Sequence, residues 1–246
     1  WMAEHDLDVL ISTDGDADRP MVVDDQARVV SGDVLGALTS RRLGAEVICT
    51  PVSSNTQVDK GFGRVVRTRI GSPFVIAAME EALAQDKQAK VVGYEANGGF
   101  LLGFEAKGPK GSLSPLMTRD CVLPIVAPQV AAREAGMDLS ALVDGLPARF
   151  TAADRIQGID SDVSRAFIQR LSGDASARAG FFADHGDEIA VDDTDGLRVT
   201  FASGVILHLR PSGNAPEFRC YAEAGSRERA TDLCVATLQK LKLELA

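Results

Sequence analysis

Three aspartates alternate with small residues near the start of the chain, in the stretch Ser12-Thr13-Asp14-Gly15-Asp16-Ala17-Asp18-Arg19-Pro20. This stretch directly follows the apolar run Val9-Leu10-Ile11, and a short loop can turn its carboxylates toward one point. Carboxylates held close together repel one another until a cation neutralises them. Ligands that are all oxygen select a hard cation, Mg²⁺ or Ca²⁺, over softer metals. We therefore predict a metal site in this segment (the Asp loop, residues 14–19), with Asp14, Asp16 and Asp18 as ligands.

Other kinds of site also use aspartates at this spacing. An EF-hand loop needs Gly at its sixth position and Glu at its twelfth. Counted from Asp14, these positions hold Arg19 and Asp25, which disfavours an EF-hand. A Mg²⁺-dependent phosphatase would use Asp14 as its nucleophile, and this alternative stays open. The purely structural alternative is a polar turn after a buried strand.

A second polar segment (the Arg loop, residues 210–219) follows the predicted strand over residues 205–209 and reads Arg-Pro-Ser-Gly-Asn-Ala-Pro-Glu-Phe-Arg. Guanidinium groups match the geometry of phosphate oxygens, and a glycine lets backbone N–H groups approach an anion. The alternative is a hairpin turn in which the arginines are incidental. The candidate phosphate-binding residues are Arg210, Ser212, Gly213, Asn214 and Arg219.

A third segment, Gly93-Tyr94-Glu95-Ala96-Asn97-Gly98-Gly99, places a carboxylate and an amide in a glycine-rich turn (the Glu loop, residues 95–99). Such groups can hydrogen-bond sugar hydroxyls. A glycine-rich turn is also common where no ligand binds. The segment therefore gives Glu95, Asn97 and Gly98 as candidate sugar-binding residues.

The overall composition limits the classes of partner. The chain has 246 residues, is 45% hydrophobic and carries a net charge of −9, which argues against binding to nucleic acid or to an anionic membrane surface. No apolar run approaches the roughly 18 residues of a membrane span. The cysteines form no C-x-x-C pair, which favours a reduced, cytoplasmic setting. The chain begins at Trp1 without a methionine, and we expect it to be part of a longer protein.

Strands and helices alternate over the first 147 residues. Residues 7–12 predict a buried strand, and residues 45–50, 64–70 and 90–93 predict further strands, with a helix over residues 74–85. We expect a loop at residues 106–114 and a helix opening at Thr118-Arg119-Asp120. This rhythm is typical of an α/β fold, with a mainly parallel mixed sheet and flanking helices. The Asp loop and the Glu loop both lie beyond strand carboxyl ends, where such sheets place functional groups.

The pattern changes from Phe150 onward. A helix over residues 162–171 is followed by strands at 189–191, 197–201 and 205–209, and Ser226 can cap a final helix. We expect this part to form a small α+β domain.

The three segments, taken in order, resemble the motifs of the α-D-phosphohexomutases, a family that includes phosphomannomutase, phosphoglucomutase and phosphoglucosamine mutase. The Asp loop resembles the metal loop of that family, the Glu loop its sugar-recognition loop and the Arg loop its C-terminal phosphate loop. Thr118-Arg119-Asp120 also resembles part of the third of the family's four domains. The resemblance implies that residues 1–32 end the second domain, 33–147 form the third and 148–246 form the fourth.

This resemblance implies an isomerase that moves a phosphoryl group between the 1- and 6-hydroxyls of a hexose phosphate, by way of a phosphoserine and a bisphosphosugar. It makes Mg²⁺ the expected cofactor at Asp14, Asp16 and Asp18. Arg19 becomes the candidate catalytic residue, acting electrostatically. A hexose phosphate is then the expected partner, and the protein is expected to be a monomer or a dimer.

The chain also departs from the family pattern. Asn214 and Ala215 stand where Thr and Glu are usual, and Ile70-Gly71-Ser72-Pro73 replaces a Gly-Asp-Arg or Gly-His contact. The printed sequence contains no stretch like the Thr-Ala-Ser-His-Asn-Pro segment that carries the phosphoserine. We therefore expect the chain to be inactive alone. A non-catalytic sugar-phosphate-binding fragment remains an alternative beside the phosphatase.

Overall fold

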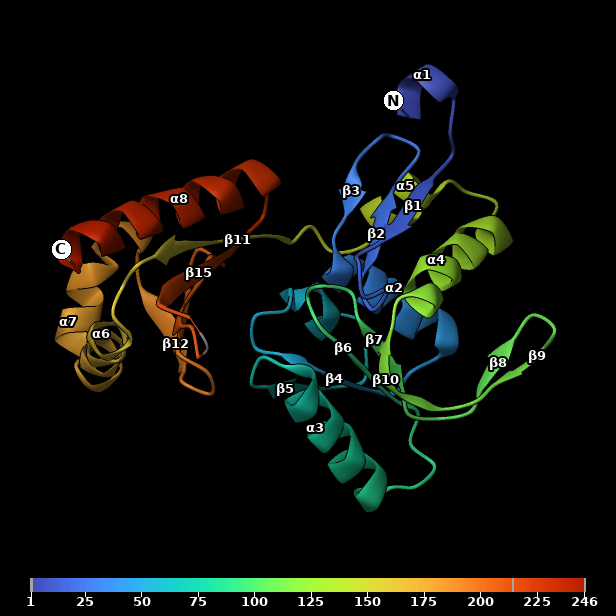
Figure 1. Cartoon of the computed structure of the whole chain (residues 1–246), viewed down its shortest axis with the longest axis horizontal. Coiled ribbons are helices and arrows are strands. Elements are labelled where there is room, and N and C mark those ends of the chain that lie inside the picture. Colours follow the sequence, from blue (N-terminus) through green and yellow to red (C-terminus); the bar gives the residue numbers. More distant parts are fainter. Residues whose placement is uncertain (1, 214, 246) are drawn as a thin grey trace. The chain divides into compact units, whose positions relative to one another are not determined.

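The structure is a computed structural model that describes residues 2–213 and 215–245 (Figure 1). The chain divides into two compact units, Trp1–Pro147 (the first unit) and Ala148–Ala246 (the second unit). Within the described ranges, no helix combines the length and the apolar character needed to cross a membrane.

The first unit opens with a short helix and a small antiparallel sheet. The helix is α1 (Met2–His5), and the sheet has the order β1 (Leu10–Thr13), β2 (Pro20–Val23) and β3 (Val29–Val30). The Asp loop joins β1 to β2. The prediction of a buried strand at residues 7–12 is wrong in its burial, because Ile11 is 53% exposed. β1 is an edge strand that pairs only with β2 among the described strands, so β2, in the middle, makes the core contacts.

A five-stranded mixed sheet forms the centre of the first unit. Its order is β10 (Leu116–Asp120), β7 (Phe100–Leu102), β6 (Val91–Tyr94), β4 (Val47–Pro51) and β5 (Arg64–Thr68). β4 is parallel to both β5 and β6, whereas β7 is antiparallel to β6 and to β10. Four of the five strands therefore run in one direction, and the predicted α/β class with a mixed, mainly parallel sheet is confirmed.

Helices cover both faces of this sheet (Figure 1). α3 (Ser72–Gln85) packs Val75 and Met79 against Cys49 and Val91 on one face. α2 (Gly32–Leu43) and α4 (Val122–Ala135) lie against the other face, where Ile48 and neighbouring strand residues are buried. Alternation along each strand supplies apolar side chains to both faces, as a sheet between two helical layers requires. The short helices η1 (Thr56–Asp59) and α5 (Leu139–Asp144) complete the unit.

Two local predictions in the first unit are wrong. Residues 106–114 form a hairpin of β8 (Ala106–Gly108) and β9 (Gly111–Leu113) rather than a structureless loop. Thr118 to Asp120 belong to β10 and do not open a helix. The predicted helix does form, but it begins at Val122. The Asp120 carboxylate accepts hydrogen bonds from the backbone N–H groups of Val122 and Leu123 at the start of α4.

The second unit is an antiparallel sheet covered by helices, which confirms the expected small α+β class. Its strand order is β11 (Phe150–Gln157), β15 (Glu217–Ala224), β14 (Ile206–Pro211), β13 (Leu197–Phe201) and β12 (Glu188–Asp192). The helices are α6 (Ser161–Gly173), α7 (Ala175–Phe181), η2 (Ala183–His185) and α8 (Arg227–Glu244). Ser226 caps α8 as predicted, since its hydroxyl accepts the N–H of Arg229.

The two faces of this second sheet differ in chemistry. Leu207, Leu209 and Phe218 are fully buried in a core that also includes residues of α6 and α8. Alternate residues point to the opposite face, and the register places Arg210 directly opposite Arg219 there. The apolar face packs against the helices, and the opposite face carries the two arginines.

We predict that truncating the core of the second unit destabilises that unit strongly. Leu207 is fully buried on β14, and Leu207→Ala should lower its free energy of unfolding by about 3 kcal/mol, through lost burial and a cavity. Urea unfolding followed through backbone NMR signals of the second unit measures this change. Leu243→Ala is the matched control because Leu243 is 83% exposed, and it should change stability by less than about 0.5 kcal/mol. Equal effects of the two substitutions would contradict the core assignment.

Candidate functional site

The Asp loop is closed on itself by hydrogen bonds to its first residue. The N–H of Asp14 donates to the Arg19 carbonyl at 3.2 Å. The N–H groups of Asp18 and Arg19 both donate to Oδ1 of Asp14 at 3.3 Å. Ala17 adopts a left-handed φ of 56°, a conformation that is uncommon for residues other than glycine. Asp14 therefore organises the loop backbone, while Asp16 is exposed at its tip.

Two arginines lie against the carboxylates of the Asp loop. Nε of Arg19 is 3.5 Å from Oδ2 of Asp14 and 3.7 Å from Oδ1 of Asp18. Arg119, from β10, forms an ion pair with the other carboxylate oxygen of Asp18. Two guanidinium groups beside two of the three carboxylates offset most of the negative charge of the loop, which helps to hold the acidic segment together.

The structure does not gather the predicted metal ligands into a formed site. Within the described ranges, no three His, Cys, Asp or Glu side chains are grouped so that they could hold a metal ion. The loop nevertheless offers only hard oxygen donors, and Oδ1 of Asp18 is buried without a hydrogen-bond donor in the described part of the chain. An unsatisfied buried carboxylate oxygen is the kind of acceptor that a hard cation binds. The residues therefore fit a hard cation by type, and the ligand set stays a prediction.

The Glu loop lies directly beside the Asp loop in the first unit. The backbone of Gly99 is close to both Asp18 and Arg119, because a Cβ placed on Gly99 would be 3.1 Å from the Arg119 side chain and 3.3 Å from the Asp18 carbonyl. A Cβ on Gly98 would meet Pro20 at 2.6 Å, and its φ of 92° also favours glycine. The two loops can pack this closely because both contact points are glycines.

Glu95 is the buried carboxylate of this arrangement. It follows β6, is 7% exposed, and its Oε1 atom has no hydrogen-bond partner among the described residues. Burial raises the pKa of Glu95, while the positive charges of Arg119 and Arg19 act in the opposite direction. The amide of Asn97 turns back to accept the N–H of Gly99 at 3.0 Å. Glu95 thus presents a free acceptor oxygen beside two arginines, which suits a polar, hydroxyl-bearing ligand.

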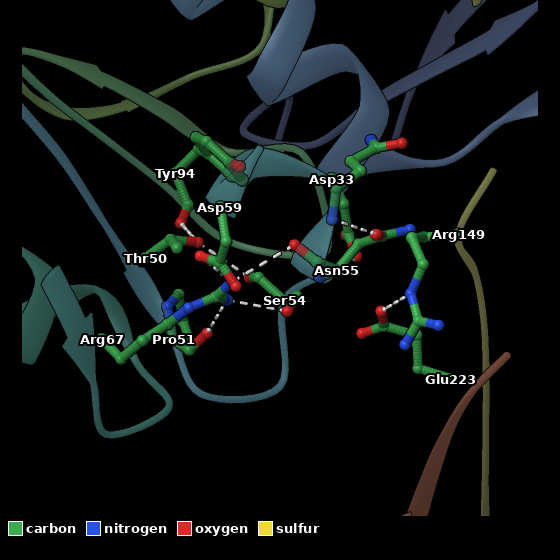
Figure 2. Close-up of polar contacts among 11 residues, drawn as sticks. Asp33, Thr50, Pro51, Ser54, Asn55, Asp59, Arg67, Tyr94, Arg149 and Glu223 are labelled. Carbon is green, nitrogen blue, oxygen red and sulfur yellow. Dashed lines mark hydrogen bonds and ion pairs between the residues drawn. The ribbon is translucent and has the colours of Figure 1, made fainter. Parts of the chain in front are cut away.

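A cluster of polar side chains, some of them buried, supports the loop after β4 at the carboxyl end of the parallel strands (Figure 2). The Arg67 guanidinium donates to the Ser54 carbonyl at 2.7 Å and to the Asp59 carboxylate at 2.8 Å. Asp33, near the start of α2, accepts the N–H of Asn55 at 2.9 Å. The Thr50 hydroxyl donates to the Tyr94 carbonyl at 2.9 Å and so ties β4 to the residue before Glu95. Side chains from three separate segments therefore fix this end of the sheet.

The Arg loop belongs to the second unit. The N–H of Ser212 donates to the Glu217 carbonyl at 2.8 Å, which closes the loop between β14 and β15. Gly213 is exposed with open space around its Cα, and Asn214 lies outside the described residues. Arg210 and Arg219 are cross-strand neighbours at the base of the loop. The structure therefore brings both predicted phosphate-binding arginines together at one end of the sheet.

A third arginine extends this row. Arg155 on β11 is in register with Arg219, so Arg155, Arg219 and Arg210 lie abreast on three adjacent strands. Glu217 lies among them, with ion-pair distances of 3.3 Å to Arg155 and 3.2 Å to Arg219. The sequence reasoning missed Arg155 because it did not predict β11, and the register of three strands cannot be read from one segment.

Two further arginine contacts were also missed. Arg119 was noted only as part of a family-like motif, yet it links Asp18 to the neighbourhood of Glu95. Arg210 is paired with Asp195, which precedes the β13 strand, at 2.9 Å. The Asp-Gly turn at residues 195–196 was visible in the sequence, but nothing there showed which strand it packs against.

The comparisons with known proteins place the chain in a family. Residues 31–150 match the model of phosphoglucomutase/phosphomannomutase alpha/beta/alpha domain III, and residues 169–240 match that of the phosphoglucomutase/phosphomannomutase C-terminal domain. The chain belongs to the phosphoglucomutase/phosphomannomutase family, as its three motifs predicted.

Curated relatives of this family match the whole chain. It is 44% identical over 242 residues to a phosphomannomutase of Sinorhizobium fredii, covering 98% of this chain and 51% of the relative. It is 40% identical over 248 residues to a phosphomannomutase of Salmonella muenchen, covering 100% and 51%. The chain thus spans about half the length of the curated relatives it matches.

A solved structure shares the fold. Aspergillus fumigatus N-acetylphosphoglucosamine mutase, determined in complex with GlcNAc-6P and magnesium, superposes with a TM-score of 0.62 at 16% identity. The superposition covers 98% of this chain and 49% of that one. At this identity the likeness shows the fold alone.

A buried histidine on β14, two residues before Arg210, predicts how the stability of the second unit depends on pH. His208 is 2% exposed on β14, and burial lowers its pKa from 6.5 to about 4. Between these two pH values the unfolded chain binds a proton that the folded chain does not, so folding stability falls as the pH falls. From pH 7 to pH 4 the wild type should lose about 3 kcal/mol relative to His208→Gln, which cannot take up this proton.

Urea unfolding of the second unit at a series of pH values measures this difference. The comparison with His208→Gln removes the contributions of all other titrating groups, which the two proteins share. Parallel stability curves for the two proteins would show that His208 is not a buried neutral histidine.

Proposed function

We propose that this chain forms the sugar-recognition and phosphate-binding part of a phosphohexomutase of the phosphomannomutase/phosphoglucomutase type, which interconverts hexose 1- and 6-phosphates. The observation that carries the proposal is the close packing of the Asp loop and the Glu loop around Arg119 in the first unit. The relatives named phosphomannomutase make mannose phosphates the first substrates to test.

In the proposed reaction, a serine phosphoryl donor outside the printed sequence transfers its group to the free hydroxyl of the hexose phosphate. A bond forms between the hydroxyl oxygen and phosphorus as the serine O–P bond breaks, and the hydroxyl proton ends on the released serine oxygen. The resulting bisphosphosugar returns its other phosphoryl group to the serine. Such transfers depend on positioning and on charge stabilisation more than on covalent help from the protein.

The first unit supplies the charge-stabilising groups in this proposal. Asp14, Asp16 and Asp18 would hold Mg²⁺, which when bound offsets negative charge on a transferring phosphoryl group. The A. fumigatus relative of the same fold was solved with magnesium, which supports this choice of cation. Arg19 lies beside two of these carboxylates and would add a fixed positive charge.

The remaining site residues divide by chemistry. Glu95 would accept hydrogen bonds from sugar hydroxyls, and the Asn97 amide would donate to them or accept from them. Gly98 would allow the backbone to approach the sugar closely. The second unit would hold a phosphate group through Arg210, Ser212, Gly213, Asn214 and Arg219. We also propose that residues 1–32 end a metal-loop domain, that 33–147 form the sugar-recognition domain and that 148–246 form the phosphate-binding domain.

The metal site gives a direct prediction on this chain. Mn²⁺ titration followed by electron paramagnetic resonance should detect a site that Mg²⁺ competes for, and Asp18→Asn should weaken Mn²⁺ binding at least about tenfold, through loss of a charged ligand. Asp232→Asn is the control, because it removes the same charge from an exposed position on α8. Equal affinities of the two variants would remove Asp18 from the ligand set.

Sugar recognition by Glu95 is tested with two ligands. Glu95→Gln should weaken the binding of mannose 6-phosphate about tenfold, because the charged acceptor for the hydroxyls is lost. It should leave the binding of inorganic phosphate unchanged. Glu105→Gln, at an exposed position, is the control for the charge change. Isothermal titration calorimetry gives both affinities, and an unchanged affinity for mannose 6-phosphate in Glu95→Gln would contradict the assignment.

The mutase proposal and the phosphatase alternative differ in their products. Incubated alone with mannose 1-phosphate and Mg²⁺, the chain should release no inorganic phosphate and gain no phosphate on Asp14 by mass spectrometry. Together with the serine phosphoryl donor of the longer protein, it should yield mannose 6-phosphate. Phosphate release with phosphorylated Asp14 would establish the phosphatase instead.

A further inference from the structure

The ion pair between Arg210 and Asp195 is more buried than an ordinary surface pair. Nε of Arg210 is 2.9 Å from Oδ2 of Asp195, and the two side chains are only 16% and 8% exposed. Nε makes no hydrogen bond among the described residues, so the pair restrains the guanidinium through charge attraction in a poorly solvated place. A guanidinium has five N–H donors, so it can hold Asp195 and a phosphate group at the same time.

The turn that carries Asp195 is built to reach Arg210. Gly196 follows Asp195 with a φ of 92°, and a Cβ there would be 2.4 Å from the Leu209 carbonyl and 3.1 Å from Cα of Arg210. Both the conformation and the space therefore require glycine. The turn packs against the backbone of β14 at Arg210 itself, which places the Asp195 carboxylate beside that side chain.

A second set of contacts joins Asp195 to Arg219. The backbone carbonyl of Asp195 lies 2.6 Å from Nε2 of His208, and because a carbonyl can only accept, Nε2 carries the hydrogen. The His208 ring stacks on Tyr221 with ring centres 5.1 Å apart and an angle of 23°. The Tyr221 hydroxyl in turn interacts with the Arg219 guanidinium. Contacts therefore run from Arg210 to Arg219 without involving residues 211–218 between them.

We propose that Asp195 and Tyr221 are positioning residues that hold Arg210 and Arg219 side by side for a phosphate monoester, with His208 as the neutral spacer between them. The proposal rests on the proposed function of the Arg loop in phosphate binding. Two guanidinium groups on opposite cross-strand positions repel each other. A carboxylate against one of them and a hydroxyl against the other hold both in place before any ligand arrives, which lowers the ordering cost of binding.

The direction in which Asp195→Asn changes ligand affinity distinguishes a positioning role of Asp195 from a purely electrostatic one. If Asp195 only contributed negative charge near the site, Asp195→Asn would strengthen the binding of an anion. If Asp195 positions Arg210, the same substitution should weaken the binding of mannose 6-phosphate and of inorganic phosphate about tenfold, the low end of the effect seen for groups that support a ligating side chain. Tyr221→Phe removes only a hydroxyl and should weaken both ligands in the same direction, by about threefold.

The test is an NMR titration of the 246-residue chain with mannose 6-phosphate and, separately, with inorganic phosphate. We expect the Arg210 Nε–H signal to exchange slowly in the wild type, where Nε is buried 2.9 Å from the Asp195 carboxylate, and faster in Asp195→Asn. Glu188→Gln is the matched control, since it breaks the ion pair of Arg178 with Glu188 elsewhere in the second unit and should leave both affinities unchanged. Arg210→Ala should weaken both ligands about a hundredfold.

These variants separate the two claims. Weaker binding in Arg210→Ala together with unchanged or tighter binding in Asp195→Asn would overturn the positioning role and leave the proposed function intact. Unchanged binding in Arg210→Ala would overturn the phosphate-binding role itself, and the positioning role with it. If Asp195→Asn does not fold, an unchanged affinity in Tyr221→Phe overturns the proposal in its place.

Discussion

Arginine–carboxylate pairs are the interactions on which the candidate functional loops of both units depend. The Asp loop has two such pairs, through Arg19 and Arg119, and the base of the Arg loop has another between Arg210 and Asp195. These loops have few ladder hydrogen bonds of their own, so charge-assisted contacts decide their shape. Breaking the Arg210–Asp195 pair would leave an uncompensated charge in a poorly solvated place, which costs more than the pair gains.

The same pairs explain how an acidic protein can offer anion-binding surfaces. The net charge of −9 is spread over the chain, while the sheet of the second unit gathers Arg155, Arg219 and Arg210 in one row. Strand register creates this local excess of positive charge, because residues opposite each other share a face. Glu217 and Asp195 neutralise part of it, so the row is stable without a ligand.

Most regular elements of the fold could be predicted from sequence because their signals are local. Ser226 caps α8 as its sequence position indicated, and the helix predicted over residues 74–85 lies within α3 (Ser72–Gln85). β15 was not predicted, although Phe218, Cys220 and Ala222 alternate with polar residues. The reason is that residues up to 219 were assigned to the phosphate-binding motif and therefore interpreted as a loop. β10 was mistaken for a helix start because its last residue, Asp120, does cap α4.

The candidate site was predictable only in part, for a related reason. Its three loops were found because each concentrates its chemistry within ten residues. Arg119, Asp195 and Arg155 were not assigned, because each acts through a contact with a residue distant in the chain. Such contacts depend on strand order and register, which follow from packing of the whole unit rather than from any segment.

A crystal structure of this chain with mannose 6-phosphate would test the account most directly. We predict that the phosphate oxygens lie within hydrogen-bond distance of the Arg210 and Arg219 guanidinium groups, with the Asp195 carboxylate still paired to Arg210. A phosphate bound elsewhere, with both arginines left without ligand contacts, would contradict the account.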